Sequence, residues 1–454
     1  MSGIQNWRCW CSSLVMASVL IACLQEHTFA QITPDNTLPN NSSVAKEGNT
    51  FNITGGTQAG SNLFHSFGEF SVPTNGIASF NNAVDIQNII SRVTGKSLSN
   101  IDGLIHVNGV TNLFLINPNG IIFGSNASLN IGGSFIASTA SSLNFADGIK
   151  FRATDPQTTP LLTVSVPIGL QFGATASPIR NQSRANNPDG TKNIFNQPVG
   201  LQVKPGKTLA LVGGDITLEG GNLTAKGGQI ELGSVAGNSL VSLKPKDQSW
   251  ILGYEAVQNF QNIRLMLRNS QIPSQVDASG KSGGSIQLWG NSVELVGSLV
   301  RLISQTTGNT KGEDLNITAS KFIVSDGAQV LTSTSGTGKA GNLNVNASES
   351  VDLIGSSILP LTSRPLASSL ASATFGEGNV GDLTITTKRL RIQDGANVSL
   401  EASGIRIAPF FIILRPATGQ QGNLKVNALE SVEIDGTTAT SHIFTQNPIG
   451  CHGS

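Results

Sequence analysis

Charge is scarce in this sequence and balanced in sign. Only 12% of the 454 residues are charged, and 28 Lys and Arg stand against 28 Asp and Glu. A chain without excess positive charge has no electrostatic footprint for nucleic acid, so we expect no nucleic-acid partner. Amphipathic helical periods are also missing after the first thirty residues, which excludes a helical fold.

Residues that build sugar-binding clefts and metal sites are few as well. Beyond residue 30, only Trp250, Trp289 and Tyr254 could serve as stacking platforms for a polysaccharide. No His-Glu-x-x-His pattern and no pair of cysteines accompanies the histidines of this part of the chain. We therefore expect no catalytic residue, no metal site and no cofactor.

Cysteine is rarer still in the main part of the chain. Of the 4 cysteines, Cys9, Cys11 and Cys23 precede residue 30, and Cys451 is the other one. No internal disulfide can form once the first thirty residues are removed. The stability of such a chain has to come from packed β-structure.

The first thirty residues have the composition of a secretion signal. Arg8 precedes an apolar run over residues 11–24, which is too short for a comfortable bilayer span. The Thr-Phe-Ala run ending at Ala30 places small residues where a signal peptidase accommodates them, so we expect cleavage between Ala30 and Gln31. The Leu-Ile-Ala-Cys run ending at Cys23 also resembles a lipobox, and the alternative is a lipidated Cys23.

Glycine, in contrast, is abundant, and it separates short runs of β-forming residues. The 51 glycines stand beside many Asn, Ser, Thr, Val, Leu and Ile, which is typical of short strands joined by turns. The clearest turn is Asn117-Pro118-Asn119-Gly120, between two apolar runs. Asn117 can hydrogen-bond to the backbone ahead, Pro118 fixes φ, and Asn119 and Gly120 tolerate the backbone conformations of the last two turn positions. We predict a tight turn in an all-β fold.

The C-terminal part of the sequence repeats itself. Residues 346–355 and 427–436 match in register at an offset of 81, and the Gly-Asn/Asp-Leu starts at Gly341, Gly381 and Gly422 are 40 and 41 apart. A fixed period in this range is typical of a solenoid, in which each unit buries its apolar face against the next. At about 20 residues per coil, the chain would form on the order of 20 coils.

Five blocks between residues 64 and 173 stand in an order that one family shares. They cover residues 64–67, 88–95, 112–124, 133–139 and 166–173. Together they resemble the N-terminal secretion domain of filamentous haemagglutinin-type exoproteins. The family motif Asn-Pro-Asn-Gly-Ile falls on Asn117, Pro118, Asn119, Gly120 and Ile121. The chain departs from many relatives at Asn81-Asn82, where they have an Asn-Pro pair.

The resemblance implies a right-handed parallel β-helix whose secretion motif is the Asn117–Ile121 segment. It implies a partner, an outer-membrane transporter of the two-partner secretion type, and export to the cell surface or the medium. We expect a signal peptide over 1–30, a secretion domain over 31–180, further coils over 181–298 and repeats over 299–454. Residues 445–454 show no clear cap, as expected of a truncated exoprotein.

The expected function is a secreted, non-catalytic surface adhesin that binds a host-cell, polysaccharide or neighbouring-cell receptor. Two alternatives stay open, a lipid-anchored surface structural protein and a carbohydrate-active β-helix enzyme. Glu349, Asp352, Glu430 and Glu433 recur with the repeat, which favours a solvated face over a unique acid and base pair.

Overall fold

The computed structural model describes residues 31–156, 160–187, 190–247, 249–359, 365–402, 405–408, 411–414, 417–436 and 442–446. Every regular element in these ranges is a β-strand, and no helix long and apolar enough to cross a membrane occurs in them. The predicted all-β composition is therefore confirmed. Gln31 is the first described residue, so Ala30 and Cys23 lie outside this part of the chain, as does Cys451.

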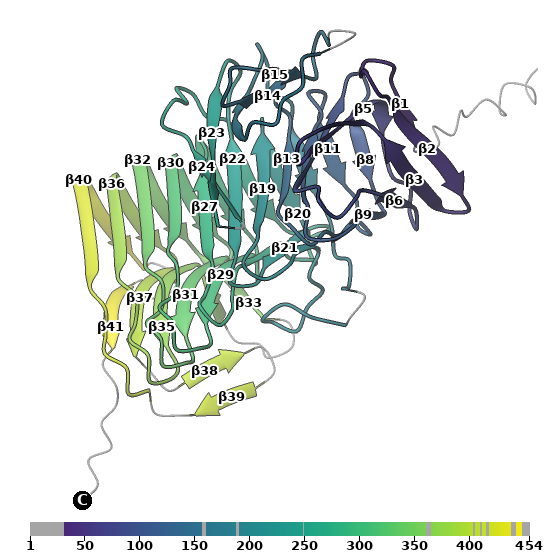
Figure 1. Cartoon of the computed structure of the whole chain (residues 1–454). Coiled ribbons are helices and arrows are strands. Elements are labelled where there is room, and N and C mark those ends of the chain that lie inside the picture. The colour runs from purple at the N-terminus through teal and green to yellow at the C-terminus, as the bar shows by residue number, and fades with distance from the viewer. Residues whose placement is uncertain are drawn as a thin grey trace, which may run out of the picture. The chain divides into compact units, whose positions relative to one another are not determined.

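The described strands wind into successive coils that stack on one another (Figure 1). The stack has three faces, and the strands within each face run parallel to one another. The first face holds eleven strands, each paired in parallel with the next: β5 (Asn62–Phe70), β7 (Asn88–Val93), β10 (Asn112–Ile116), β13 (Phe135–Ser138), β19 (Thr208–Gly213), β22 (Gln229–Ser234), β27 (Ser285–Trp289), β30 (Leu315–Ser325), β32 (Leu343–Ile354), β36 (Leu383–Gln393) and β40 (Leu424–Asp435).

The other two faces follow around each coil. The second face begins with β8 (Ser99–Ile101), β11 (Ile121–Phe123), β17 (Ile179–Asn181), β20 (Ile216–Glu219), β25 (Ile263–Met266) and β28 (Ser292–Val296), and it continues in the second halves of β30, β32, β36 and β40. The third face consists of two sheets. The first continues from β3 (Thr50–Gly55) through β6 (Ile77–Phe80), β9 (Leu104–Val107) and β12 (Ser128–Asn130). The second holds β18 (Leu201–Val203), β21 (Asn222–Ala225), β26 (Gln275–Asp277), β29 (Arg301–Thr306), β31 (Gln329–Thr334), β35 (Ser369–Thr374), β37 (Asn397–Ala402) and β41 (His442–Gln446). This arrangement is the predicted parallel β-helix.

A column of aliphatic side chains fills the interior of the coils. Leu315, Leu343 and Leu383 are partners in register on neighbouring strands, and each is 0% exposed. Successive residues of a strand point to opposite sides of the sheet, so alternate residues enter this column. The alternation of side chains along each strand therefore buries its apolar residues against those of the coils above and below.

The estimate of about 20 coils was wrong, because coil length varies strongly. Partners lie 21 residues apart between Thr208 and Gln229, but 74 apart between Phe135 and Leu209, where additional strands leave the coil. The predicted periods of 40 and 41 are single coils, and the 81-residue period spans two of them. Hairpins lengthen these coils: β33 (Ser356–Ile358) pairs with β34 (Pro365–Ala367), and β38 (Ile405–Ala408) with β39 (Phe411–Leu414).

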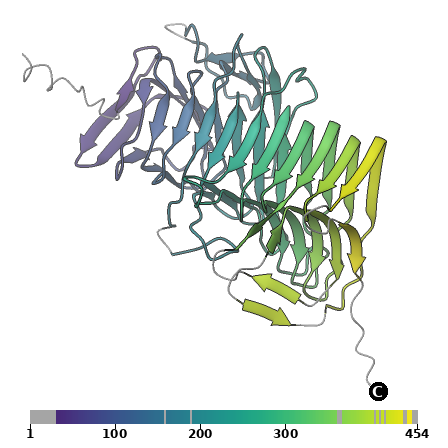
Figure 2. The same ribbon diagram turned by 180° about the vertical axis from the view of Figure 1, so that it is seen from behind.

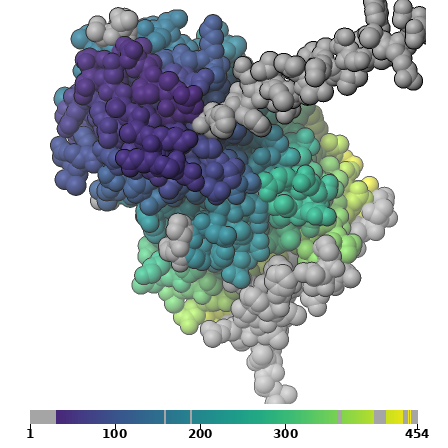
Figure 3. Space-filling model, turned by 90° about the vertical axis from the view of Figure 1, so that its right-hand side faces the viewer, coloured from purple at the N-terminus to yellow at the C-terminus, as the bar shows by residue number. Residues whose placement is uncertain are grey.

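Antiparallel strands close the N-terminal end of the coils. They are β1 (Ile32–Pro34), β2 (Ser42–Glu47), β3 (Thr50–Gly55) and β4 (Thr57–Ala59). Strands β1 and β4 pair with β5, and β2 pairs with β3, which in turn starts the third face. Figure 3 looks onto this end, where the purple surface of the first strands faces the viewer. These four strands form a cap over the first coil. Without the cap, the edge of that coil would expose unpaired backbone groups to which other chains could pair.

An additional antiparallel sheet, here called the outer sheet, packs against the outside of the first face. It contains β14 (Ser142–Phe145), β15 (Lys150–Arg152), β16 (Pro167–Gln171), β23 (Leu240–Lys246) and β24 (Ser249–Gly253). Leu113 and Leu115 of β10 enter the inner column, while Phe114 belongs to a second hydrophobic core under the outer sheet. A strand buried on both sides reads as a continuous apolar run, which explains the sequence of β10.

Candidate secretion motif

The Asn117–Ile121 motif forms the corner between β10 and β11. The N–H of Gly120 donates to the carbonyl of Asn117 over 3.2 Å, which closes the predicted tight turn. Gly120 has a φ of +117°, a conformation that L side chains rarely adopt. Ile121 follows with 0% exposure and enters the inner column.

Asn117 is 0% exposed, and its side chain joins the corner to the preceding coil. Its Nδ2 donates to the carbonyl of Ser97 over 3.1 Å and to Oγ of Ser99 over 2.9 Å. Its Oδ1 accepts the backbone N–H of Asn119 over 3.0 Å, the interaction with the backbone ahead that the sequence predicts. Each polar atom of this buried amide therefore has a partner.

The rest of the corner is tied to the coils on both sides. Asn119 Nδ2 donates to the carbonyl of Gly95 in the preceding coil over 2.8 Å. Toward the following coil, Ser177 Oγ donates to the carbonyl of Pro118 over 2.6 Å, and the backbone N–H of the first motif residue donates to the carbonyl of Ser138 over 2.9 Å. The motif thus braces three successive coils, a role that its spacing in the sequence did not reveal.

Asn82 occupies the position at which the sequence departs from many relatives. It is 9% exposed, and its Nδ2 donates to the carbonyl of Asn108 over 3.3 Å and to Oγ1 of Thr111 over 3.1 Å. Its Oδ1 accepts the backbone N–H of Asn108 over 3.2 Å. This asparagine therefore also links its coil to the next one.

Arg92 is a fully buried cation that the sequence reasoning did not single out. Its guanidinium donates to Oγ of Ser66 over 2.8 Å and to the carbonyl of Arg152 over 2.6 Å, and it lies 4.1 Å from the ring centre of Phe151. Burial lowers the pKa of Arg92 to about 10. The side chain holds the β14–β15 hairpin of the outer sheet against β7. The sequence feature that could have indicated this role is a single charged residue in an otherwise uncharged strand.

His65 is also buried and packs between aromatic rings. Its ring centre lies 5.9 Å from that of Phe67 and 5.4 Å from that of Phe80, and Nδ1 lies 3.0 Å from Oγ of Ser42. Burial lowers its pKa to about 4, so the ring is neutral at neutral pH. Within the described residues, no three His, Cys, Asp or Glu side chains are grouped to hold a metal ion.

Comparison with known proteins places this geometry in a family. The family model of the TPS secretion domain, where TPS stands for two-partner secretion, matches residues 30–288. The HMW1 secretion domain from Haemophilus influenzae is similar in structure at a TM-score of 0.45 and 16% identity, over 92% of this chain and 100% of that chain. No curated protein matches the sequence.

The family match confirms the resemblance seen in the sequence blocks, and with it the expected export route. It covers more than half of the 454 residues and includes the whole Asn117–Ile121 corner. The chain therefore belongs to the TPS secretion domain family, the exoproteins that an outer-membrane transporter partner exports to the cell surface or the medium.

Proposed function

We propose that the exported protein is a surface adhesin without catalytic activity. Adhesion is proposed from the family match, and the observation that carries the lack of catalysis is the arrangement of the repeated acidic residues. Asp352 is 5% exposed and accepts Nε of Arg391 over 2.6 Å, and Glu430 pairs with Arg389 over 3.0 Å. Carboxylates that pair with cations of a neighbouring coil stabilise stacking, whereas an acid and base pair must face an open cleft.

The position of the aromatic residues supports the same proposal. Trp250 is 3% exposed and Tyr254 is 2% exposed, and both belong to the core under the outer sheet. Tyr254 stacks on Trp289 with ring centres 5.2 Å apart. Rings that pack against one another beneath a sheet do not form an open platform for a sugar.

The described surface also has a pocket of about 330 Å³ beside the β14–β15 hairpin. Arg92, Lys150 and Arg152 line it together with Leu161, and no carboxylate is among its lining residues. A pocket lined by cations lacks the two carboxylates that glycosidic cleavage requires. This pocket is therefore not a candidate site for glycosidic cleavage.

Adhesion and turnover can be measured on the same purified exoprotein. We expect cells that display the chain to bind host cells, polysaccharide surfaces or neighbouring cells better than cells without it, and we expect no product from a polysaccharide panel. Steady turnover of any polysaccharide would favour the enzyme. A mature N-terminus at a diacylglyceryl-modified Cys23, instead of at Gln31, would favour the lipid-anchored alternative.

We also propose that the Asn117–Ile121 corner serves secretion by bracing the coils that fold outside the cell. The side-chain amides of Asn117 and Asn119 hold the preceding coil, so Asn117→Ala with Asn119→Ala removes a donor from the buried hydroxyl of Ser99 and from the carbonyls of Ser97 and Gly95. Each unsatisfied buried group costs roughly 1–3 kcal/mol. We expect the amount of exoprotein in the medium to fall at least tenfold.

Asn130→Ala is the matched control, because Asn130 is an exposed asparagine in β12 of the same coil. The purified double variant should also unfold at a lower denaturant concentration than the control. Normal secretion of the double variant would contradict a role for the corner. Lost secretion with unchanged stability would instead indicate direct contact with the transporter.

The division into a secretion domain over 31–180, coils over 181–298 and repeats over 299–454 stays a prediction. Export of fragments 1–180 and 1–298 beside the transporter would check it. Secretion of the shorter fragment would support the boundary at 180, and secretion of the longer one alone would contradict it.

A further inference from the structure

Three Asn-Gly dipeptides occur in the sequence, and all of them lie in the N-terminal coils, which are purple and blue in Figure 2. They are Asn75-Gly76, Asn108-Gly109 and Asn119-Gly120. An asparagine followed by glycine is prone to deamidation, because a glycine nitrogen without a neighbouring side chain attacks the asparagine amide with little hindrance. The local sequence is the same in all three places, so the fold decides which of them reacts.

The dipeptide in the secretion motif is locked by hydrogen bonds. Nδ2 of Asn119 donates to the carbonyl of Gly95 over 2.8 Å and to Oδ1 of Asn117 over 2.9 Å. The N–H of Gly120 donates to the carbonyl of Asn117. Both the amide that would be attacked and the nitrogen that would attack it are therefore held in place.

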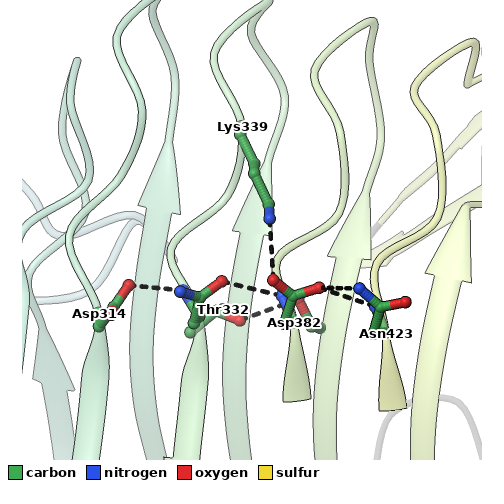
Figure 4. A network of polar contacts seen from close by, with 7 residues as sticks. Asp314, Thr332, Lys339, Asp382 and Asn423 are labelled. Carbon is green, nitrogen blue, oxygen red and sulfur yellow. Dashed lines mark hydrogen bonds and ion pairs between the residues drawn. The ribbon is translucent and has the colours of Figure 1, made fainter.

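Asn423, at the start of a coil in the repeat array, has a similarly held side chain (Figure 4). Its Nδ2 donates to Oδ1 of Asp382 over 3.0 Å, and its backbone N–H donates to the same oxygen over 2.8 Å. Asparagine side chains in this position link one coil to another. An asparagine whose side chain makes no such link differs from them in its reactivity.

Asn108 has a free side chain next to a free backbone nitrogen, in the turn between β9 and β10. In the described part of the chain, no group hydrogen-bonds to its side-chain amide, and the N–H of Gly109 donates to no acceptor. Gly109 is exposed at a φ of +69°, and a Cβ placed on it would meet no atom within 4 Å. The turn thus leaves room for the amide to approach the nitrogen.

Asn75 lies between these two cases. Its side chain is exposed, but the N–H of Gly76 donates to the carbonyl of Pro73 over 2.8 Å, and Gly76 is buried. A nitrogen that donates to a carbonyl keeps its proton, whereas the attack requires its deprotonated form. The turn at Asn75 has to open before the reaction can start.

We propose that Asn108 is a deamidation site of the folded exoprotein. The backbone nitrogen of Gly109 forms a bond to Cγ of Asn108, and the side-chain nitrogen takes up the displaced proton and leaves as ammonia. Water then opens the cyclic imide at one of its two carbonyls, which gives aspartate or isoaspartate. No reagent other than water is consumed.

The products alter a link between coils. The backbone N–H and carbonyl of Asn108 both bond to the side chain of Asn82 in the preceding coil. Aspartate adds a negative charge beside this link. Isoaspartate also routes the chain through the former side chain, so the old carbonyl becomes a carboxylate and leaves the backbone.

Peptide mapping by mass spectrometry after incubation of the purified exoprotein at pH 8 tests the proposal. Asn108 should deamidate at least about tenfold faster than Asn119, with Asn75 between them, because local opening has to precede the attack where hydrogen bonds hold the groups. In urea the three sites should react at similar rates. Equal rates in the folded protein, or the same order of rates in urea, would overturn the proposal.

A pair of glycine variants checks the attacking nitrogen. Gly109→Ala should slow deamidation at Asn108 at least about tenfold, because the added methyl group hinders the attack. Gly48→Ala is the matched control, since Gly48 also has a positive φ, of +58°, and open space around it, but follows Glu47. It should leave the rate at Asn108 unchanged. An unchanged rate in Gly109→Ala would contradict attack by the nitrogen of residue 109.

Discussion

The N-terminal and C-terminal coils are stabilised by different interactions, although both stack in the same way. Coils up to β27 are irregular in length, rich in Phe and enclosed by a cap and the outer sheet, so they have two hydrophobic cores. Coils from β30 to β40 have long, regular strands, one inner column and charge pairs between neighbours. The first group is covered by additional sheets on its outside, and the second is a repeat array whose coils contact mainly their neighbours, while one inner column runs through both.

The largest difference is expected on removing an aromatic side chain from the N-terminal part. Phe64 packs at 5.0 Å from the ring centre of Phe151 and 5.8 Å from that of Phe145, between β5 and the outer sheet. Phe64→Ala should cost about 3–5 kcal/mol. Hydrogen exchange should show lost protection throughout the outer sheet and the first coils.

Leu390→Ala in β36 is the matched variant in the repeat array. Leu390 is also 0% exposed, and its truncation costs about 2–5 kcal/mol. Here the lost protection should be confined to β32, β36 and β40, because each coil contacts only its neighbours. Loss of protection over equally many strands in the two variants would contradict the difference between the N-terminal coils and the repeat array.

A second difference concerns pH, because Glu231 is a buried carboxyl group under the outer sheet. Burial raises its pKa from 4.5 to about 8, so the folded state holds a proton between these values that the unfolded state releases. The contribution of Glu231 to stability should therefore be greatest below pH 4.5 and be lost as the pH rises toward 8, by up to about 5 kcal/mol, while His65, whose pKa is lowered from 6.5 to about 4, acts in the opposite direction below pH 6.5. Glu231→Gln should flatten this slope in denaturant unfolding at pH 5 and pH 8.

Glu255→Gln is the control for the pH series, since Glu255 is exposed beside the same sheet. It should keep the wild-type slope. A wild-type slope equal to that of Glu231→Gln between pH 5 and pH 8 would show that the Glu231 carboxyl reaches water.

The smallest effects are expected among the charge pairs of the repeat array. Arg391→Met leaves the carboxylate of Asp352, 6% exposed at its side chain, without its cation, at a cost of about 2 kcal/mol. Arg389→Met breaks a pair whose side chains are 49% and 50% exposed, at a cost of about 0–1 kcal/mol. Thermal unfolding should show a larger loss of stability for Arg391→Met than for Arg389→Met. The reverse order would show that burial does not decide how strongly an ion pair stabilises the coils.

Part of the site could be predicted from the sequence, and part of it could not. Asn117 was predicted to bond with the backbone ahead, and it does so through Asn119. Its bonds to Ser97 and Ser99 were not predictable, because they join residues of two coils whose register is set by the length of every turn between them. Arg92 was overlooked for the same reason, since its partners lie 26 and 60 positions away in the sequence.

The sequence by itself determined the all-β composition, the tight turn at Asn117, the repeat periods of 40 and 41 residues and the family, because these rest on residue types, alternation and order along the chain. Only the tertiary structure decided the number of coils, the burial of Trp250 and Tyr254 under the outer sheet and the pairing of charges between coils. The physical reason is that local patterns specify a strand and its two sides. Which strand packs against each side depends on insertions of very different length between the strands. The effect of these insertions on packing is fixed only when the coils stack.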